Sequence, residues 1–313
     1  MNLYKNLIFI LYLGIFLGPG FRTPAQSRDS ITLYGTLDTV QVIRQRIQHA
    51  NEANAGARVT HISPAILQAN KTRSLAELLT DHTSIYIKSL GTGALSTASF
   101  RGTSASQTRV NWNGINITPP LSGTFDFSQI PVFFTDNINL YYGSSHVKNG
   151  TGAIGGSVNL FTDTDWNRGV NGRVLAEYGS YNKYTVGGQA NISGNKSASK
   201  TRLYYQHSDN DYTYLNKVLT NIPFREKRQD AAYSQFGIMQ EGYFRVSPYT
   251  RLTAVAWYQK NHRNLPQPLG VVNRSQEDQE ENNFRGYAGL DFSRGIHELH
   301  VKAAWLYFCQ TYD

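Results

Sequence analysis

The sequence has little cysteine and few charges. Cys309 is the single cysteine among 313 residues, so both an internal disulfide and a thiol-ligated metal centre are excluded. Charged residues make up 17% of the chain, compared with about 25% in average soluble domains. The formal net charge is +8, but the lysines and arginines are scattered, and no basic run is interleaved with aromatic residues. This distribution argues against a nucleic-acid partner and favours a surface that faces an anionic envelope.

Catalytic signatures are also missing. The sequence contains no G-x-S-x-G, H-E-x-x-H or P-loop motif, the patterns that place a nucleophile, a zinc ion or a phosphate. The histidines are isolated apart from His297 and His300, and residues three apart on a strand point to opposite faces, so these two cannot share a metal. The sequence therefore predicts a protein that is not an enzyme.

The N-terminus has the layout of an export signal. Lys5 precedes an apolar run from Leu7 to Leu17, and a small-x-small site follows at Ala25, Gln26 and Ser27. This order predicts a secretory signal peptide over residues 1–27, since the apolar run is too short to span a bilayer.

Residues 29–162 have a mixed pattern. Ser74 and Glu77 form a capping box that predicts a helix over Ser74–Leu79. Asn113-Gly114, between RVNW and INIT, predicts a tight hairpin because both turn residues accept positive φ. Short β-prone segments alternate with glycine-rich turns, so an α+β domain is expected here.

From Gly169 onward the pattern is alternation of apolar and polar residues, as in YTVGGQANI at Tyr184–Ile192. The chain is also rich in glycine (27) and tyrosine (20), which favours strands and turns. Alternating segments of about ten residues with aromatic ends are typical of outer-membrane β-barrels. The alternation alone leaves a secreted β-sandwich open.

The connections favour the barrel. Short turns at Ser247–Tyr249 and at Arg294-Gly295 alternate with two long polar loops, Asp209–Asp230 and Asn261–Asn282. Short turns at one end and long loops at the other are expected of a barrel whose turns face the periplasm.

Four segments together resemble the plug domain of TonB-dependent outer-membrane receptors. They are LDTVQVI, SLAELLTDHTSIYIKSLG, SFRGTSASQTRVNWNGINI and GTGAIGGSVNLFT, in that order from Leu37 to Thr162. Within that family the chain is most similar to cobalamin and siderophore transporters. The usual Arg-Gly-Pro is replaced by Tyr142-Gly143-Ser144, and the usual Tyr-Gly ahead of GAIGG is replaced by Asn149-Gly150-Thr151.

The resemblance implies active transport of a scarce nutrient, cobalamin or a ferric siderophore, with a TonB-type energy-transducing protein, outer-membrane lipid and the small-molecule nutrient as partners. LDTVQVI is the expected TonB box, because a short β-prone segment can pair with a periplasmic partner by strand addition. The rival hypothesis is a secreted or surface adhesin that binds through tyrosine-rich loops. The box consists of Leu37, Asp38, Thr39, Val40, Gln41, Val42 and Ile43.

Three further groups of site residues are expected. The ligand-facing plug apices are Gly91, Thr92, Gly93, Leu95, Ser96, Pro119, Pro120, Leu121 and Ser122. Contacts between plug and barrel are expected at Arg101, Gly102, Gly155 and Gly156, because Arg pairs with buried carboxylates and glycine lets backbone approach a wall. For Arg101, a plain turn residue is the alternative. Asp209 and Asp211 are candidate calcium ligands, supported by the calcium use of cobalamin transporters; ordinary solvated loop charge is the alternative.

The expected domains are the signal peptide 1–27, the box and linker 28–58, the plug 59–163 and barrel strands over 164–313. At roughly twenty residues per strand, the last part supplies about seven or eight strands, whereas plugged barrels have about 22. The chain also stops within the alternating segment HELHVKAAWLYFCQTYD. We therefore expect an α+β plug domain followed by antiparallel β strands of an incomplete, roughly 22-stranded outer-membrane β-barrel, a truncated product unable to transport alone.

Overall fold

The computed structural model describes residues 58–120, 122–143, 153–218, 223–267 and 276–313. All of them belong to one compact unit, Ala50–Asp313. The expected signal peptide and the box Leu37–Ile43 lie outside the described residues. Among the residues that are described, no helix is long and apolar enough to cross a membrane.

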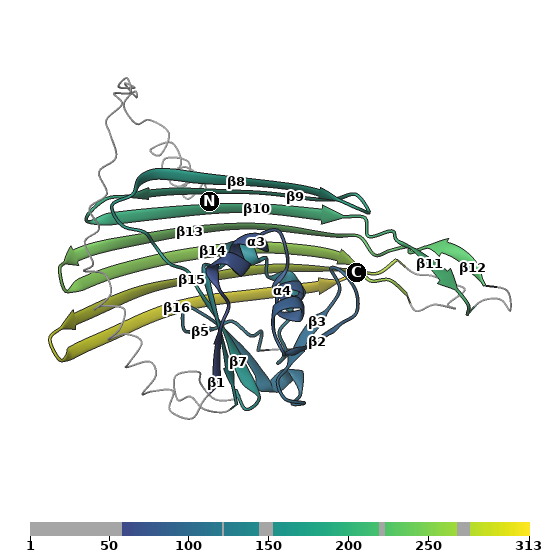
Figure 1. The fold of residues 1–313 in the computed structure, drawn as a ribbon, viewed down its shortest axis with the longest axis horizontal. Coiled ribbons are helices and arrows are strands. Elements are labelled where there is room, and N and C mark those ends of the chain that lie inside the picture. Colours follow the sequence, from purple (N-terminus) through teal and green to yellow (C-terminus); the bar gives the residue numbers. More distant parts are fainter. Residues whose placement is uncertain (1–57, 121, 144–152, 219–222, 268–275) are drawn as a thin grey trace, which may run out of the picture. The chain divides into compact units, whose positions relative to one another are not determined.

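The N-terminal part is an α+β domain built on a five-stranded sheet (Figure 1). Its strand order is β1-β6-β7-β4-β5, with β4 and β7 parallel and the other pairs antiparallel. Strands β2 and β3 form a separate pair. The elements are β1 Arg58–His61, α3 Pro64–Ala69, α4 Leu75–His82, β2 Tyr86–Ser89, β3 Ser96–Ser99, η1 Ala105–Gln107, β4 Thr108–Trp112, β5 Ile115–Asn116, η2 Phe127–Gln129, η3 Val132–Phe134, β6 Asn137–Tyr142 and β7 Gly156–Phe161.

Helix α4 begins where the capping box predicts. Ser74 Oγ accepts from the Glu77 backbone N at 3.3 Å, and Glu77 Oε2 accepts from the Ser74 N at 2.8 Å. The helix then buries Leu75, Leu78 and Leu79 in the core of this domain. The backbone hydrogen bonds continue past Leu79, with the Thr83 N donating to the Leu79 carbonyl at 3.1 Å, so α4 extends to His82, three residues past the expected end.

The expected hairpin is confirmed between β4 and β5. Asn113 and Gly114 have φ angles of 49° and 83°, as a turn with two left-handed residues requires. The Asn113 side chain also binds the residue that follows β7. Its Nδ2 donates to Thr162 Oγ1 at 2.9 Å and its Oδ1 accepts from the Thr162 N at 3.0 Å.

The C-terminal part is a seven-stranded antiparallel sheet in the order β16-β15-β14-β13-β10-β9-β8. Its strand number and antiparallel pairing confirm the sequence-based expectation. Strands β8 and β16 are the two edges of the described sheet. The strands are β8 Gly169–Gly179, β9 Lys183–Ser193, β10 Ser197–Ser208, β13 Tyr233–Ser247, β14 Thr250–Asn264, β15 Asp278–Arg294 and β16 His297–Tyr312.

Short turns are present at both expected places, Ser247–Tyr249 and Arg294-Gly295, with Pro248-Tyr249 and Gly295-Ile296 as the residues between the strands. We call their side of the sheet the turn end. The opposite side is the loop end. The loop expected over Asn261–Asn282 is too long, because β14 and β15 pair through Asn264 and Asp278. The loop expected over Asp209–Asp230 contains a hairpin of its own, β11 Thr213–Asn216 and β12 Phe224–Lys227.

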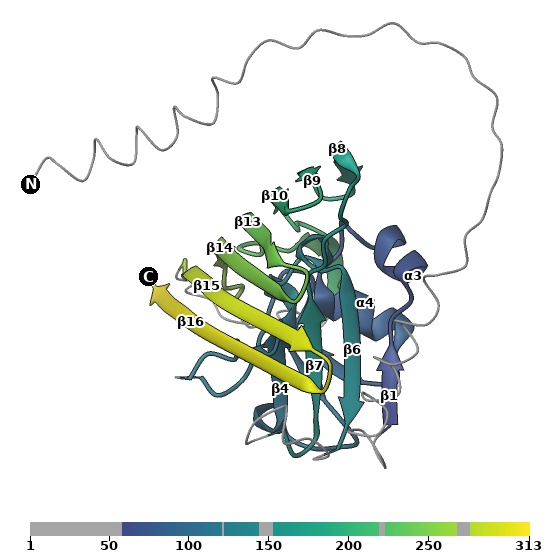
Figure 2. The same cartoon turned by 90° about the vertical axis from the view of Figure 1, so that its left-hand side faces the viewer.

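The two faces of the large sheet differ in polarity. The plug lies on one face (Figure 2), and there the buried side chains are mostly polar, including Thr185, Arg202, Gln235, Glu241 and Gln259. The other face exposes apolar side chains. They include Val174, Val186, Leu203, Phe244, Leu252 and Trp305. A sheet that is apolar outside and polar inside has the polarity of a transmembrane β-barrel wall.

Candidate functional site

A cavity of about 500 Å³ opens at the loop end, between the plug and strands β14, β15 and β16. The plug supplies the β2–β3 turn and the segment before η2, and the sheet supplies the side chains nearest the loops. The lining residues are Leu90, Ala94, Leu95, Pro119, Ser122, Thr124, Phe125, Asp126, Gln129, Ile130, Arg228, Arg263, Asn264, Leu265, Pro266, Gln279, Glu281, Asn283, Arg285, Gln310 and Tyr312.

Asp126 organises the plug side of this cavity. It is the N-cap of η2, the position where a carboxylate accepts from free backbone N–H groups. Its Oδ1 accepts from the backbone N of Ser128 at 3.0 Å and from the backbone N of Ser96 at 3.0 Å. Asp126 therefore ties η2 to the start of β3 and fixes the plug apex.

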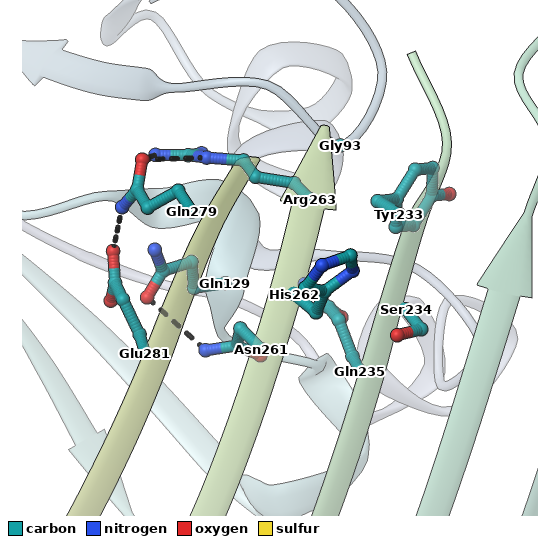
Figure 3. Close-up of a pocket in the computed structure, with 10 residues that line it drawn as sticks. All are labelled: Gly93, Gln129, Tyr233, Ser234, Gln235, Asn261, His262, Arg263, Gln279 and Glu281. Atoms are coloured by element: carbon teal, nitrogen blue, oxygen red, sulfur yellow. Dashed lines mark hydrogen bonds between the residues drawn. The ribbon is translucent and has the colours of Figure 1, made fainter. Parts of the chain in front are cut away.

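Arg263, near the end of β14, connects this apex to the sheet. Its Nη1 donates to Asp126 Oδ2 at 2.7 Å, and both side chains are about nine-tenths buried. Its Nη2 and Nε donate to Gln279 Oε1 at 2.9 and 3.1 Å, and Gln279 in turn donates to Glu281 (Figure 3). Asn261 Nδ2 donates to Gln129 Oε1 at 3.2 Å. These bonds form one polar network between plug and strands.

A second polar cluster joins the plug to β10 and β13. Asp136, just before β6, accepts from Lys200 Nζ at 2.9 Å and from Arg202. Arg202 is fully buried and also lies 3.4 Å from Glu241. Burial alone would raise the pKa of Asp136, but the charges of Arg202 and Lys200 outweigh it and lower that pKa to about 2. Asp136 is therefore ionised at neutral pH.

An aromatic cluster fills the space between these two polar groups. Phe134 of η3 packs against Trp257 with ring centroids 5.3 Å apart and against Tyr204 at 6.0 Å. Trp112 of β4 packs against Trp257 at 5.4 Å and Tyr287 at 5.3 Å. Plug and sheet are thus held by apolar contacts at the centre and by ion pairs on either side.

The expected plug apices divide between two cavities. Leu95, Pro119 and Ser122 line the large cavity. Gly91, Thr92, Gly93 and Ser96 line a neighbouring cavity of about 220 Å³ beside α4. Pro120 is exposed and lines neither, and Leu121 lies outside the described residues.

Of the residues expected to contact the barrel, Arg101, Gly155 and Gly156 have their nearest contacts within the plug, and contact with the barrel stays a prediction. The Arg101 guanidinium lies 5.9 Å from the Tyr142 ring centroid, and Arg101 and Gly102 are exposed. A Cβ on Gly155 would meet Thr103, and one on Gly156 would meet Phe100. The close approaches between plug and sheet occur elsewhere: a Cβ on Gly93 would lie 2.2 Å from Tyr233, and one on Gly237 would lie 2.6 Å from Phe134.

The two candidate calcium ligands each contact a different basic residue. Asp209 Oδ1 lies 3.0 Å from His207 Nε2, and Asp211 Oδ2 lies 2.6 Å from Lys227 Nζ. The described part of the chain contains no group of three His, Cys, Asp or Glu residues that could hold a metal ion. Calcium binding here stays a prediction. The intervening Asn210 has a structural contact, since its buried Nδ2 donates to the Thr92 carbonyl at 3.0 Å.

Sequence reasoning missed Asp126, Arg263, Asp136 and Arg202. The one local signal was the Asp126-x-Ser128 spacing of an N-cap, which marks a turn but names no partner on the sheet.

The comparisons with known proteins agree with this arrangement. Residues 51–157 match the family model described as the TonB-dependent Receptor Plug Domain. The chain is 32% identical over 135 residues to a vitamin B12 transporter BtuB of Photobacterium profundum, covering 43% of this chain and 22% of the relative. It is 32% identical over 126 residues to one of Vibrio cholerae, covering 40% and 20%. The chain thus spans about a fifth of the length of these curated relatives.

Solved receptors share the fold. The siderophore receptor PiuA of Acinetobacter baumannii aligns with a TM-score of 0.62 at 18% identity, over 83% of this chain and 37% of that one. The FrpB iron transporter of Neisseria meningitidis aligns with a TM-score of 0.64 at 12% identity, over 81% and 41%. The plug model, the relatives and the fold therefore agree: residues 51–157 match the plug domain of TonB-dependent receptors, and the chain is similar to TonB-dependent receptors of the Gram-negative outer membrane.

Proposed function

We propose that the protein takes part in TonB-dependent uptake of a small-molecule nutrient, cobalamin or a ferric siderophore, across the outer membrane. The ligand binds in the large cavity at the loop end, and a TonB-type protein in the periplasm acts on LDTVQVI. The relatives described as vitamin B12 transporters and the receptors described as siderophore receptors supply these two ligand classes.

One observation carries the proposal: the large cavity is lined jointly by the plug and by strands β14, β15 and β16 of the sheet. Asp126 and Arg263 both line it and also bond to each other across the plug–sheet boundary. A ligand in the cavity therefore contacts the groups that hold the plug apex. This arrangement suits a transporter in which binding must be communicated to a movable plug.

The apolar outer face of the sheet supports a membrane location for these strands, with lipid as the surrounding partner. Val174 and Trp305 leave more than two-thirds of their surface exposed, at 81% and 69%. In water such a continuous apolar surface would aggregate. In a bilayer the same apolar surface contacts the hydrocarbon chains of the lipids.

The test is substitution in the box. Val40→Pro removes a strand donor and bends the segment, so cells whose only copy of the protein carries this substitution should lose energised uptake of cyanocobalamin or ferric siderophore while surface binding is retained. Val40→Ile, which keeps the backbone N–H and the β preference, should take up ligand normally. Undiminished uptake by the proline variant would contradict the assignment of LDTVQVI.

A further inference from the structure

The large cavity contains more positive than negative side chains. Among the described residues, three arginines line it, Arg228, Arg263 and Arg285, and two carboxylates face them, Asp126 and Glu281. Arg263 is neutralised by Asp126 at 2.7 Å. Two guanidinium groups are then left in one cavity with a single carboxylate.

Glu281 is already engaged by uncharged donors. Its Oε1 accepts from the side chains of Gln279 and Gln310, the latter at 3.2 Å. No carboxylate of the described residues lies within 4.0 Å of the Arg285 guanidinium. Arg285 is therefore a buried cation without a counter-ion in direct contact.

The residues around Arg285 fix its position but leave part of its hydrogen-bonding capacity unused and its charge unpaired. The side chain is almost fully buried, with 3% of its surface exposed, and its guanidinium lies 4.5 Å from the Trp257 ring centroid. Nη1 donates to Gln259 Oε1 at 3.0 Å, whereas Nε is buried and has no hydrogen-bond partner. A buried charge that lacks a partner is costly, so an anionic group that enters the cavity would relieve that cost.

Apolar side chains make up much of the remaining wall. Leu90, Leu95, Phe125, Ile130 and Leu265 line the same cavity. A site with apolar walls and a few placed polar groups fixes the orientation of a ligand through those groups. The complementary ligand has an apolar or aromatic body and an anionic oxygen.

We propose that this cavity selects an anionic small molecule, one that carries carboxylate or phenolate oxygens, and that Arg285 is the residue that determines this selectivity, with Arg228 attracting the ligand at the loop end. The inference rests on the proposed function for the location of the site. It goes further in favouring an anionic chelate over an uncharged ligand of similar size.

Equilibrium binding to native protein in outer-membrane vesicles tests the proposal. The probes are a ferric tris-catecholate complex, which is anionic, and a ferric tris-hydroxamate complex and cyanocobalamin, which are uncharged. We expect the anionic complex to bind at least about tenfold more tightly than either uncharged probe. Its affinity should fall as salt rises, because salt screens charges at the mouth of the cavity.

The substitution Arg285→Gln keeps a hydrogen-bond donor and removes the charge. We expect it to weaken binding of the anionic complex by about tenfold to a hundredfold and to leave the uncharged probes unchanged. The matched control is Arg251→Gln, which removes a charge paired with Asp291 at 2.8 Å on neighbouring strands near the turn end. It should leave all three affinities unchanged. If Arg285→Gln fails to fold, Arg228→Gln, at a half-buried position, still tests the proposal. It should reduce the salt dependence of the affinity for the anionic complex.

Equal affinity for charged and uncharged probes would overturn the proposal, as would equal effects of the Arg285 and Arg251 substitutions, or no binding by any probe. These measurements need no energy source. The binding measurements can still be interpreted if uptake proves independent of Val40. That uptake result would contradict the proposed function and would not bear on the selectivity of the cavity.

Discussion

Replacing Asp136 with asparagine tests whether ion pairs hold the plug against the strands. Asp136 is the plug's contribution to a cluster that contains Lys200, Arg202 and Glu241. Asparagine has the same shape and removes the charge. The two cations of the sheet would then share Glu241 alone, which lies 3.4 Å from Arg202.

The size of the expected destabilisation follows from the pKa of Asp136. The cluster lowers the pKa of Asp136 from 3.8 to about 2, and one pKa unit corresponds to about 1.4 kcal/mol. The ionised carboxylate therefore stabilises the docked plug by about 2–3 kcal/mol. Breaking a buried pair costs about 3–5 kcal/mol in general. We expect the smaller cost of about 2–3 kcal/mol here, because Glu241 remains as a partner for Arg202.

Backbone hydrogen exchange measures the effect locally. In Asp136→Asn at neutral pH, the amides of β6 and η3 should exchange about thirtyfold to a hundredfold faster than in the unmodified protein. Because the folded-state pKa is lowered, the contribution is complete above the ordinary pKa near 4 and is lost as the pH falls toward 2. Protection, corrected for intrinsic exchange, should therefore be constant from pH 7 to about 5 and fall below about 4.

The matched control is Asp163→Asn. Asp163 is exposed, and its Oδ1 accepts from the neighbouring Thr164 backbone N at 2.8 Å. Its substitution removes one negative charge close to the cluster and should change the exchange of β6 by less than about threefold. If the two variants exchange alike, or if Asp136→Asn matches the unmodified protein, the reasoning about this ion-pair cluster is refuted.

Two further substitutions test packing and local structure. Gly237→Ala should lower the stability of the docked plug by about 1–3 kcal/mol, because the new Cβ would lie 2.6 Å from Phe134; Gly188→Ala, with nothing within 4 Å, should be neutral in the same exchange assay, and equal effects would contradict the close approach. Ser74→Ala removes the N-cap of α4 and should cost about 1 kcal/mol, seen as faster exchange confined to Leu75–His82. Unchanged exchange there would show that the capping box does not stabilise the helix.

Features set by neighbouring residues were predictable from the sequence. The capping box at Ser74, the Asn113-Gly114 turn and the turn at Pro248-Tyr249 each depend on a few adjacent side chains, and each is confirmed. The alternation of the strands is also local, since successive side chains of a strand point to opposite faces. The alternation expected over Tyr184–Ile192 is confirmed in β9, with Thr185 buried and Val186 exposed.

The strand ends were mispredicted for a physical reason. Asn261 and Asn282 read as loop residues because both are polar, yet both belong to paired strands. Asn261 lies on the face that meets the plug, where the interior of the sheet is polar, so its polarity does not mark a loop. Asn261 Nδ2 bonds to Gln129 of the plug. Asn282 lies on the other face near the loop end, where its Oδ1 accepts from Tyr258 Oη at 2.9 Å.

The site could not be derived from local pattern. Asp126 and Arg263 are 137 residues apart, and Asp136 and Arg202 are 66 apart. Each residue taken singly reads as an ordinary surface charge. Arg101 lies in a turn with a φ of 50°, the alternative that the sequence left open, and its contact with the wall stays a prediction; ion pairs between the plug and the described strands are made by Arg202 and Arg263 of the strands.

The distribution of contacts bears on how a plug can be both secure and movable. Hydrogen bonds such as that of Gln235 to the Ser128 carbonyl, 2.9 Å long, exchange readily for bonds to water, so each adds only about 1 kcal/mol. The aromatic contacts of Phe134 and the charge of Asp136 cannot be replaced by water at similar cost. Because η3 carries Phe134 and is followed within two residues by Asp136, both costly contacts lie on one short segment. We therefore expect a pull on the plug to meet strong resistance at residues 132–136, with the buried Asp126–Arg263 pair and the Trp112–Trp257 contact as separate points of resistance, and the uncharged hydrogen bonds elsewhere to yield with little further force.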